Sequence, residues 1–303
     1  MEKKLYGFVV LHYLDLEMTK KCVDSIVSNY REYNIQVAIV DNGSGNNSGE
    51  RLRDLYKDNE KVTVLINKEN MGFARGNNTG YHYLRKYYNL DYIVILNNDV
   101  IINQRNFLEK VDEIYFRIGY DVLGPDIYCP FTEKHQNPSR LIPLTKEDVK
   151  ELYEILDERI KHYNKYYLKK VILTFTEGKK KNVNNQFIDY TKEYKDIVLH
   201  GACYIFSKKF IEICDTAFNP DTFLYLEEEI LYLECKRRNF CMVYSPELCV
   251  KHYEDVSTKK AFRSDYKRGK MKIKNQLHSI RVLLNLMDSL EKKNDQNLKL
   301  VMQ

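Results

Sequence analysis

The chain has 303 residues, of which 44% are hydrophobic and 30% are charged, proportions that are ordinary for a soluble enzyme with a sizeable core. No stretch approaches the roughly 18 consecutive apolar residues that a membrane-spanning helix needs. Seven cysteines lack any CxxC pair, and the N-terminus lacks the pattern of a signal peptide. We therefore expect a cytoplasmic protein with reduced thiols, built as one large α/β domain or two small ones.

The net charge of +5 is concentrated near the C-terminus. Between residues 259 and 281, nine Lys and Arg residues accompany one acid, Asp265, so this block carries +8 and the rest of the chain −3. A local basic block on a near-neutral body indicates an anionic surface or a phosphorylated ligand, not nucleic acid.

Strands and helices are predicted to alternate along the first hundred residues, which is typical of βαβ units and a parallel sheet. Apolar runs predict strands, and apolar residues at helical spacing predict helices. The predicted strands are Leu5–His12, Ile35–Val40, Val62–Asn67 and Tyr92–Leu96, and the predicted helices are Leu16–Tyr30, Glu50–Tyr56 and Ala74–Tyr88.

Residues 130–196 differ from what precedes them, because they are polar and rich in Lys, Tyr and Asn. A helix is predicted at Lys146–Tyr167 and a loop at Gly178–Asn185. We interpret this region as an insertion that faces the acceptor.

A core-like pattern returns at Ile197, with a helix predicted at Lys208–Cys214 and a strand within residues 242–254. The tail at Lys267–Leu290 has apolar residues at helical spacing, flanked by Lys and Arg. This helix either packs on the core or attaches to anionic lipid headgroups, and the sequence leaves both open.

Polar residues end two of the predicted strands. Asn97-Asn98-Asp99 follows one, and Asp41-Asn42-Gly43-Ser44 ends another. Ligands of open α/β sheets bind beyond the carboxyl ends of the strands, where Asp99 could hold Mg²⁺ or Mn²⁺ on a phosphate. Asp41 could accept hydrogen bonds from a ribose or a pyrimidine N–H. The alternative for both acids is an ordinary turn or helix cap.

Three further patterns are candidates for the site. The segment NMGFARGNNTG at 70–80 opens a helix with glycines four apart, which suits close backbone approach to an anion or close helix packing, and it matches neither GxGxxG nor a P-loop. The triplet Glu227-Glu228-Glu229 follows an apolar stretch and predicts either a solvated helix N-terminus or a carboxylate base at a pocket edge. His252 becomes a metal candidate only if the fold brings it beside Asp99.

Together these motifs resemble the family 2 glycosyltransferases of the GT-A fold, closest to the rhamnosyltransferase-like branch of bacterial polysaccharide synthesis. The resemblance covers roughly residues 5–128 and 197–256. The motifs that carry it are VVLHY at 9–13, VDNGS at 40–44, NMGFARGNNTG at 70–80, ILNNDV at 95–100, GPDI at 124–127, HGACYIFSK at 200–208, FLYLEEE at 223–229 and VKHYE at 250–254.

The resemblance implies a role for each matching residue. Asp99 and His252 would hold Mn²⁺ or Mg²⁺ on the donor diphosphate, and Glu228 would be the catalytic base with Glu227 before it. The donor nucleotide sugar, linked to UDP or dTDP, would be bound by Leu11, Tyr13, Asp41, Gly72, Asn78 and Asn98.

The resemblance also implies an organisation. A GT-A domain at 1–255, with a mostly parallel central sheet flanked by helices, would divide into a nucleotide-binding half at 1–128, the insertion at 129–196 and a base-and-metal half at 197–255. A basic helical tail at 256–303 would follow.

The implied activity is inverting, metal-dependent hexosyl transfer to a hydroxyl of a glycan or a lipid-diphosphate-linked acceptor in cell-surface polysaccharide synthesis. Attachment through 259–290 would place the protein at the inner face of the cell membrane. The alternatives are a non-catalytic relative that binds nucleotide or glycan, and a sugar-nucleotide nucleotidyltransferase.

Four positions depart from the family pattern. Asn97 and Asn98 replace the usual acids before Asp99, so fewer charges hold the metal. Glu228 stands where the family usually has Asp, and Ile230 stands where many relatives carry a further Asp.

Overall fold

The computed structural model describes residues 4–176, 187–253 and 265–301. Its centre is a ten-stranded sheet in the order β3-β2-β1-β4-β9-β6-β10-β5, with β7 beside β6 and β8 beside β10. The strands are β1 (Leu5–His12), β2 (Asn34–Asp41), β3 (Val62–Ile66), β4 (Tyr92–Asn97), β5 (Val100–Ile101), β6 (Val122–Cys129), β7 (Lys134–His135), β8 (Tyr194–Lys195), β9 (Cys203–Ser207) and β10 (Met242–His252).

The predicted mostly parallel sheet is confirmed. Strands β3, β2, β1 and β4 are parallel neighbours, and β6 and β10 form a further parallel pair. The strand β9 lies antiparallel between β4 and β6, so the two parallel groups run in the same direction. The helices are α1 (Leu16–Asn29), α2 (Ser48–Tyr56), α3 (Gly72–Tyr87), α4 (Phe107–Ile118), α5 (Lys146–Lys161), α6 (Tyr163–Thr176), α7 (Lys208–Ile213), α8 (Glu227–Arg237) and α10 (Asp265–Val301).

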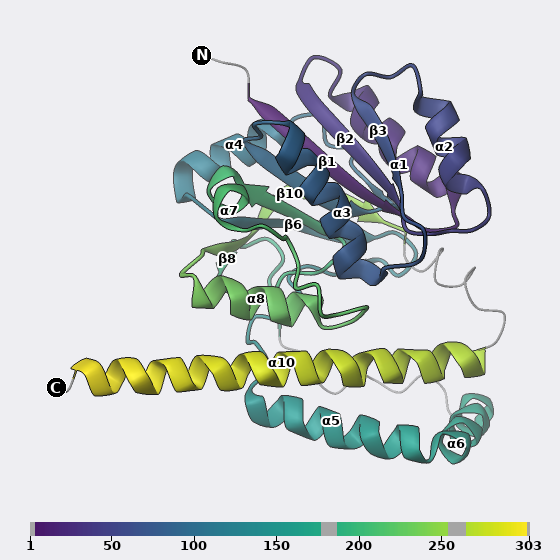
Figure 1. Cartoon of the computed structure of the whole chain (residues 1–303), viewed down its shortest axis with the longest axis vertical. Helices are drawn as coiled ribbons and strands as arrows, with labels where there is room; N and C mark the ends of the chain where they lie inside the picture. Colours follow the sequence, from purple (N-terminus) through teal and green to yellow (C-terminus); the bar gives the residue numbers. More distant parts are fainter. Residues whose placement is uncertain (1–3, 177–186, 254–264, 302–303) are drawn as a thin grey trace.

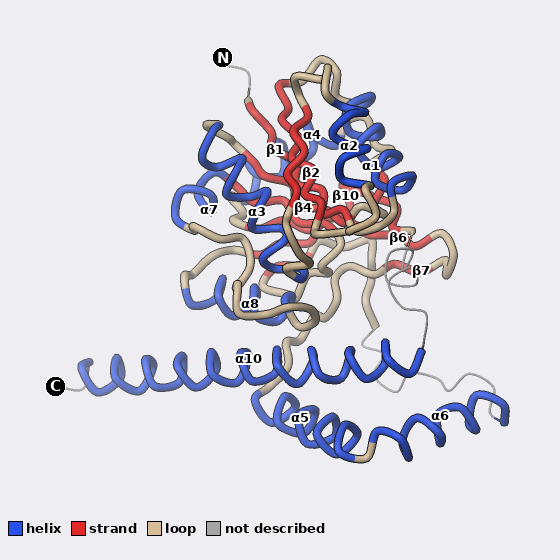
Figure 2. The backbone as a smooth tube through the Cα atoms, turned by 45° about the vertical axis from the view of Figure 1, so that its right-hand side comes forward, coloured by secondary structure: helices blue, strands red, loops and turns tan. Residues whose placement is uncertain are grey.

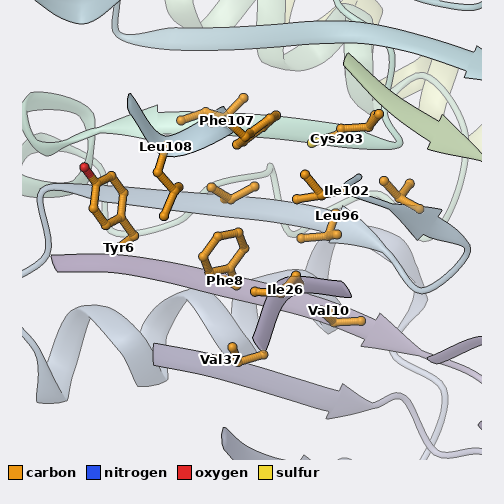
Figure 3. Packing of buried hydrophobic residues seen from close by; sticks show 14 of the residues in the cluster. Tyr6, Phe8, Val10, Ile26, Val37, Leu96, Ile102, Phe107, Leu108 and Cys203 are labelled. Carbon is orange, nitrogen blue, oxygen red and sulfur yellow. The ribbon is translucent and has the colours of Figure 1, made fainter. Parts of the chain in front are cut away.

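Both faces of the sheet are covered, because the side chains of each strand alternate between two apolar clusters. From β1, Phe8 and Val10 point into one cluster with α1, α2 and α4, and Figure 3 shows Ile26 of α1 packing there. Val9 points the opposite way, into a second cluster with α3, α7 and α8. The apolar runs that predicted the strands are therefore buried on both sides.

A third, helical layer joins the insertion to the tail. The helix α10 lies between α8 on one side and α5 on the other (Figure 1, Figure 2). Its buried stripe includes Ile273, Leu277 and Ile280, and it packs on Ile230 of α8 and Val149 of α5. The tail is thus helical and packed, as one of the two alternatives predicted. No helix within the described ranges is both long and apolar enough to cross a membrane.

One helix prediction is wrong. Lys146–Tyr167 was expected to be continuous, but α5 ends at Lys161 and α6 begins at Tyr163. Tyr163 packs its ring on Tyr266 of α10, with ring centroids 4.9 Å apart, and donates a hydrogen bond to the carbonyl of Tyr266. This tertiary contact accounts for the change of direction, which helix periodicity does not reveal. The predicted loop at Gly178–Asn185 lies outside the described residues.

Candidate active site

The candidate site lies at the carboxyl edge of the central strands. The strand register pairs His12 of β1 with Asp41 of β2, and Leu11 with Asn97 of β4. Tyr13 follows directly and is half-buried. The strand-end residues predicted to bind the donor are therefore brought to one edge of the sheet.

Asp41 is a buried carboxylate that organises the loop after β2. Its Oδ1 accepts a hydrogen bond of 3.2 Å from the backbone N–H of Ser44, and the Ser44 hydroxyl donates to the same oxygen. Its Oδ2 lies only 2.2 Å from where a Cβ at Gly49 would be, so a glycine is needed for α2 to begin this close. The turn that was the alternative for Asp41 is present, and one face of the carboxylate is occupied by it.

A buried polar network under this edge was missed from the sequence. The His12 ring lies between the hydroxyls of Thr19 and Ser48, at 2.6 Å from each, and Asn98 donates to Thr19 Oγ1 at 2.9 Å. Burial lowers the pKa of His12, which favours the neutral ring. The network ties the end of β1 and the turn after β4 to the helices α1 and α2. Its only mark in the sequence is the His of VVLHY, immediately after an apolar run.

Pairing of two strands brings His252 beside Asp99. The short strand β5 follows Asp99 and runs antiparallel to the end of β10, with His252 opposite Val100. As a result His252 Nε2 lies 3.2 Å from Asp99 Oδ1, and the N–H of Tyr253 donates to the Asp99 carbonyl at 2.9 Å. The condition set for His252 as a metal candidate is met. We call this pair the metal corner.

The donors of the metal corner fit a divalent cation. Asp99 Oδ1 is buried without a hydrogen-bond partner, a state that costs about 1–3 kcal/mol unless a cation or donor satisfies it. Two cis ligands of an octahedral ion with bonds of about 2.1 Å lie about 3 Å apart, close to the separation of these two atoms. Within the described ranges, no group of three or more His, Cys, Asp or Glu side chains is placed to hold a metal.

The acidic triplet begins α8 and is preceded by two strained residues. Tyr225 and Leu226 have φ values of 78° and 65°, a left-handed conformation that is unfavourable for residues other than glycine. Such strain persists where the surrounding structure imposes it, often at functional sites. Because of these two residues, the chain turns sharply and presents Glu227 and Glu228 at the first turn of the helix.

The three acids have three environments, and none is a freely solvated helix end. Glu227 is buried, and burial together with the neighbouring Glu228 raises its pKa to about 8. Burial also raises the pKa of Glu228, opposed by hydrogen bonds from the backbone of Glu228 and Gly201. Glu229 is buried and forms an ion pair of 2.9 Å with Arg140 of the insertion. With a pKa of about 8, Glu227 is mostly protonated at neutral pH.

Adjacent residues connect the acids to the metal corner. A Cβ at Gly201 would lie 2.8 Å from Glu228 Oε1, so the carboxylate rests on this backbone. The ring of His200 lies 5.8 Å from that of His252, centroid to centroid. Burial and the nearby His252 lower the pKa of His200 to about 4, so its ring is neutral. The motif HGACYIFSK contains both residues, but the sequence assigned neither a role.

The helix α3 holds the loop before the acids, residues 214–226, which we call the acidic loop. The Asn78 side chain accepts from the N–H groups of Ala217 and Phe218, both at 3.1 Å, and donates to the Phe218 carbonyl at 2.8 Å. Gly72 has a φ of 78°, and a Cβ there would lie 2.2 Å from the Phe223 carbonyl oxygen. Gly72 and Asn78 thus shape the acidic loop, and the Asn78 amide is engaged in doing so.

The tail holds the same loop from the other side. His278 of α10 donates from Nε2 to the Asp221 carbonyl at 2.7 Å, and the Ser279 hydroxyl donates to the Leu224 carbonyl at 3.2 Å. The ammonium of Lys272 lies 5.2 Å from the centre of the Tyr225 ring. The sequence predicted α10 as a tail, and these contacts to the acidic loop were not foreseen.

Comparison with known proteins identifies the family of this chain. Residues 8–212 match the family model described as Glycosyl transferase family 2. The chain belongs to this family. The matched range begins within β1 and extends past β9 into α7, and it includes Asp41 and Asp99. No curated protein is significantly similar to the chain in sequence.

One solved structure agrees with the fold. The crystal structure of S. aureus TarS 1-349 is 11% identical with a TM-score of 0.50, and the match covers 90% of this chain and 70% of that one. A second crystal structure, of the same TarS fragment in complex with UDP, is 12% identical with a TM-score of 0.49, covering 82% of this chain and 60% of that one. The likeness to the first supports the GT-A fold and nothing finer, while family membership identifies a nucleotide-sugar glycosyltransferase.

Proposed function

We propose that this glycosyltransferase is inverting and metal-dependent, and that Glu228 is its catalytic base. The proposal rests on one observation: two adjacent residues lie between the metal corner and the acids. His200 lies beside His252, and Gly201 lies against Glu228. At one corner Asp99 and His252 present oxygen and nitrogen donors 3.2 Å apart. At the other, Glu228 lies on the Gly201 backbone beside a Glu227 with a raised pKa.

The chemistry follows from these positions. Glu228 takes the proton from an acceptor hydroxyl, whose oxygen attacks the anomeric carbon of the donor sugar as the bond to the diphosphate breaks on the opposite side. A single displacement inverts the anomeric configuration. Asp99 and His252 would hold Mn²⁺ or Mg²⁺, which, when bound, neutralises charge on the diphosphate. Glu227, protonated at neutral pH, can donate a hydrogen bond without repelling Glu228.

The proposed donor is a UDP- or dTDP-sugar, and the proposed acceptor is a glycan or a lipid-diphosphate-linked oligosaccharide in cell-surface polysaccharide synthesis. The strand-end positions of Leu11, Tyr13 and Asp41 support binding of the base and ribose at the carboxyl edge. The rhamnosyltransferase-like branch and a cytoplasmic location remain part of this proposal.

Attachment to the inner membrane surface is the second part of the proposal. The described part of the basic block, 265–281, exposes Lys272, Lys274 and Arg281 on α10, beside a half-exposed Met271. Basic residues next to exposed apolar side chains suit anionic headgroups. Co-sedimentation with liposomes should depend on anionic lipid, and equal binding to neutral liposomes would argue against it.

Thermal-shift screening of nucleotide sugars with and without Mn²⁺ tests the donor, followed by release of nucleoside diphosphate from the best ligand. We expect one donor to stabilise the protein most in the presence of Mn²⁺ and to be turned over. Binding without turnover on any glycan acceptor would favour the non-catalytic alternative. The nucleotidyltransferase alternative predicts release of pyrophosphate from a nucleoside triphosphate instead.

A further inference from the structure

One segment of the insertion crosses the site beside the metal corner. The N–H of Gln136 donates to the Ile127 carbonyl of β6 at 2.8 Å, and the N–H of Ser139 donates to the Val198 carbonyl at 2.9 Å. The side chain of Asn137 is completely buried and links the Pro125 carbonyl to the N–H of His200, at 2.6 and 2.8 Å. The backbone of this segment is therefore firmly placed between β6 and His200.

Gln136 contacts the metal corner from this position. Its Oε1 lies 2.8 Å from Nδ1 of His252, on the side of the ring opposite Asp99. An amide oxygen only accepts hydrogen bonds, so Nδ1 must carry the proton in this pair. In the neutral imidazole the other nitrogen, Nε2, then has a lone pair that faces Asp99 Oδ1.

This arrangement suits a cation between the two side chains. A lone pair on Nε2 and a carboxylate oxygen 3.2 Å apart repel each other unless a cation, either a proton or a metal ion, lies between them. If the Gln136 NH₂ donated to Nδ1 instead, Nε2 would carry the proton and could donate directly to Asp99. Metal-binding histidines in general use such a partner to fix their tautomer and orientation.

We propose that Gln136 is a positioning residue for the metal corner: its amide oxygen holds His252 in the tautomer that binds a divalent cation with Asp99. The inference rests on the metal corner of the proposed function and deepens it. It makes the insertion, which was expected to face the acceptor, a determinant of cation affinity as well.

The test is the Mn²⁺ affinity of the full chain, measured without donor by calorimetry and by the loss of the free Mn²⁺ signal in electron paramagnetic resonance. In Q136L, which removes the acceptor, we expect affinity to fall by about 10–100-fold, the usual effect of removing such a partner. In Q136E, whose carboxylate can only accept, we expect affinity within about threefold of wild type or tighter.

Gln104→Leu is the matched control. Gln104 also anchors β10, accepting from the N–H of Cys249 at 2.9 Å and donating to the Glu247 carbonyl at 2.9 Å, but it does not contact His252. Q104L should therefore lose an anchor of β10 and keep wild-type Mn²⁺ affinity. Equal weakening in Q104L and Q136L would show a general effect on β10 and overturn the proposal.

The other outcomes distinguish the role of Gln136 from the existence of the metal corner itself. Normal Mn²⁺ binding by Q136L, or Q136E as weak as Q136L, would overturn the role of Gln136 and leave the metal corner intact. Wild-type protein that binds no Mn²⁺ would refute the metal corner, and the role of Gln136 with it. Should Q136L not fold, Q136M gives the same test, because it also removes the amide oxygen while keeping the length of the side chain, and the same loss of affinity by about 10–100-fold is expected.

Discussion

The two charged corners of the site are built in different ways. The metal corner is made by strand pairing, since β5 opposite the end of β10 puts His252 next to Asp99. The acidic corner lies at the start of α8, and the loop before it is held by side chains from α3 and α10 and includes two strained residues, Tyr225 and Leu226.

This difference has a consequence for each corner. Backbone pairing in a sheet is cooperative, so the metal corner depends mainly on its own side chains and on Gln136. The acidic corner depends on individual hydrogen bonds from distant helices, each of which contributes only about 0.5–1.5 kcal/mol. We therefore expect remote substitutions to disturb the acidic corner more readily than the metal corner.

The largest effect should come from removing the base. Glu228→Gln keeps the size of the side chain but cannot accept the proton, so sugar transfer should fall by about 10²–10⁴-fold. Donor affinity, measured by calorimetry, should stay within about threefold of wild type, since the carboxylate is proposed to act on the acceptor. Wild-type turnover of this variant on the true acceptor would remove Glu228 from the role.

Asp99→Asn tests the metal corner, because it removes the one ionised side chain of the Asn97-Asn98-Asp99 turn. Loss of several kcal/mol of charge stabilisation corresponds to a decrease of about 100-fold or more in turnover. Mn²⁺ binding should weaken together with turnover when both are measured on the same protein. Loss of turnover with unchanged Mn²⁺ binding would place the metal elsewhere.

Two glycine-to-alanine variants, one of them a control, test how α3 holds the acidic loop. Gly72→Ala must strain a φ of 78° and push Cβ against the Phe223 carbonyl, so we expect a loss of about 1–3 kcal/mol in the free energy of unfolding and at least about a tenfold loss of transfer. Gly119→Ala is the control, since its φ is 70° but no atom lies within 4 Å of the new Cβ. It should lose only about 1–2 kcal/mol and keep full activity at a temperature where it is folded. Equal activity losses would contradict a specific role for Gly72.

His278→Ala tests the contribution of α10 to the acidic loop. Losing the hydrogen bond to the Asp221 carbonyl should lower kcat by about 2–10-fold and leave the KM for the donor unchanged. Lys274→Ala, at an exposed position one turn earlier, is the comparison variant. If both variants retain wild-type kcat, the tail does not position the base.

The last prediction concerns stability and not turnover: it is the pH dependence of the free energy of unfolding that comes from Glu227. Its pKa is about 8 in the folded chain and near its ordinary value of 4.5 when unfolded. The folded state therefore binds the proton more tightly, and this group lowers stability as pH rises from 4.5 to 8. Glu227→Gln should be more stable than wild type by at least about 1.4 kcal/mol at pH 8, and by less at pH 5, in denaturant titrations without metal. An equal difference at both pH values would contradict the raised pKa.

Local patterns in the sequence were sufficient for the elements of the nucleotide-binding half. Buried parallel strands appear as apolar runs, and β1, β2, β3 and β4 lie within one or two residues of their predicted bounds. Polar residues directly after those runs also marked Asp41 and Asp99, since the carboxyl ends of parallel strands share an edge. The family, too, was evident from the order of these motifs.

Only the tertiary structure decided how the distant parts combine. No local pattern states that β5 pairs with the end of β10, that Gln136 lies against His252, or that α10 holds the acidic loop, because each is a contact between segments far apart in the sequence. The buried His12 network was missed for the same reason. Periodicity reports which face of an element is buried, but the partner that covers this face is determined by packing alone.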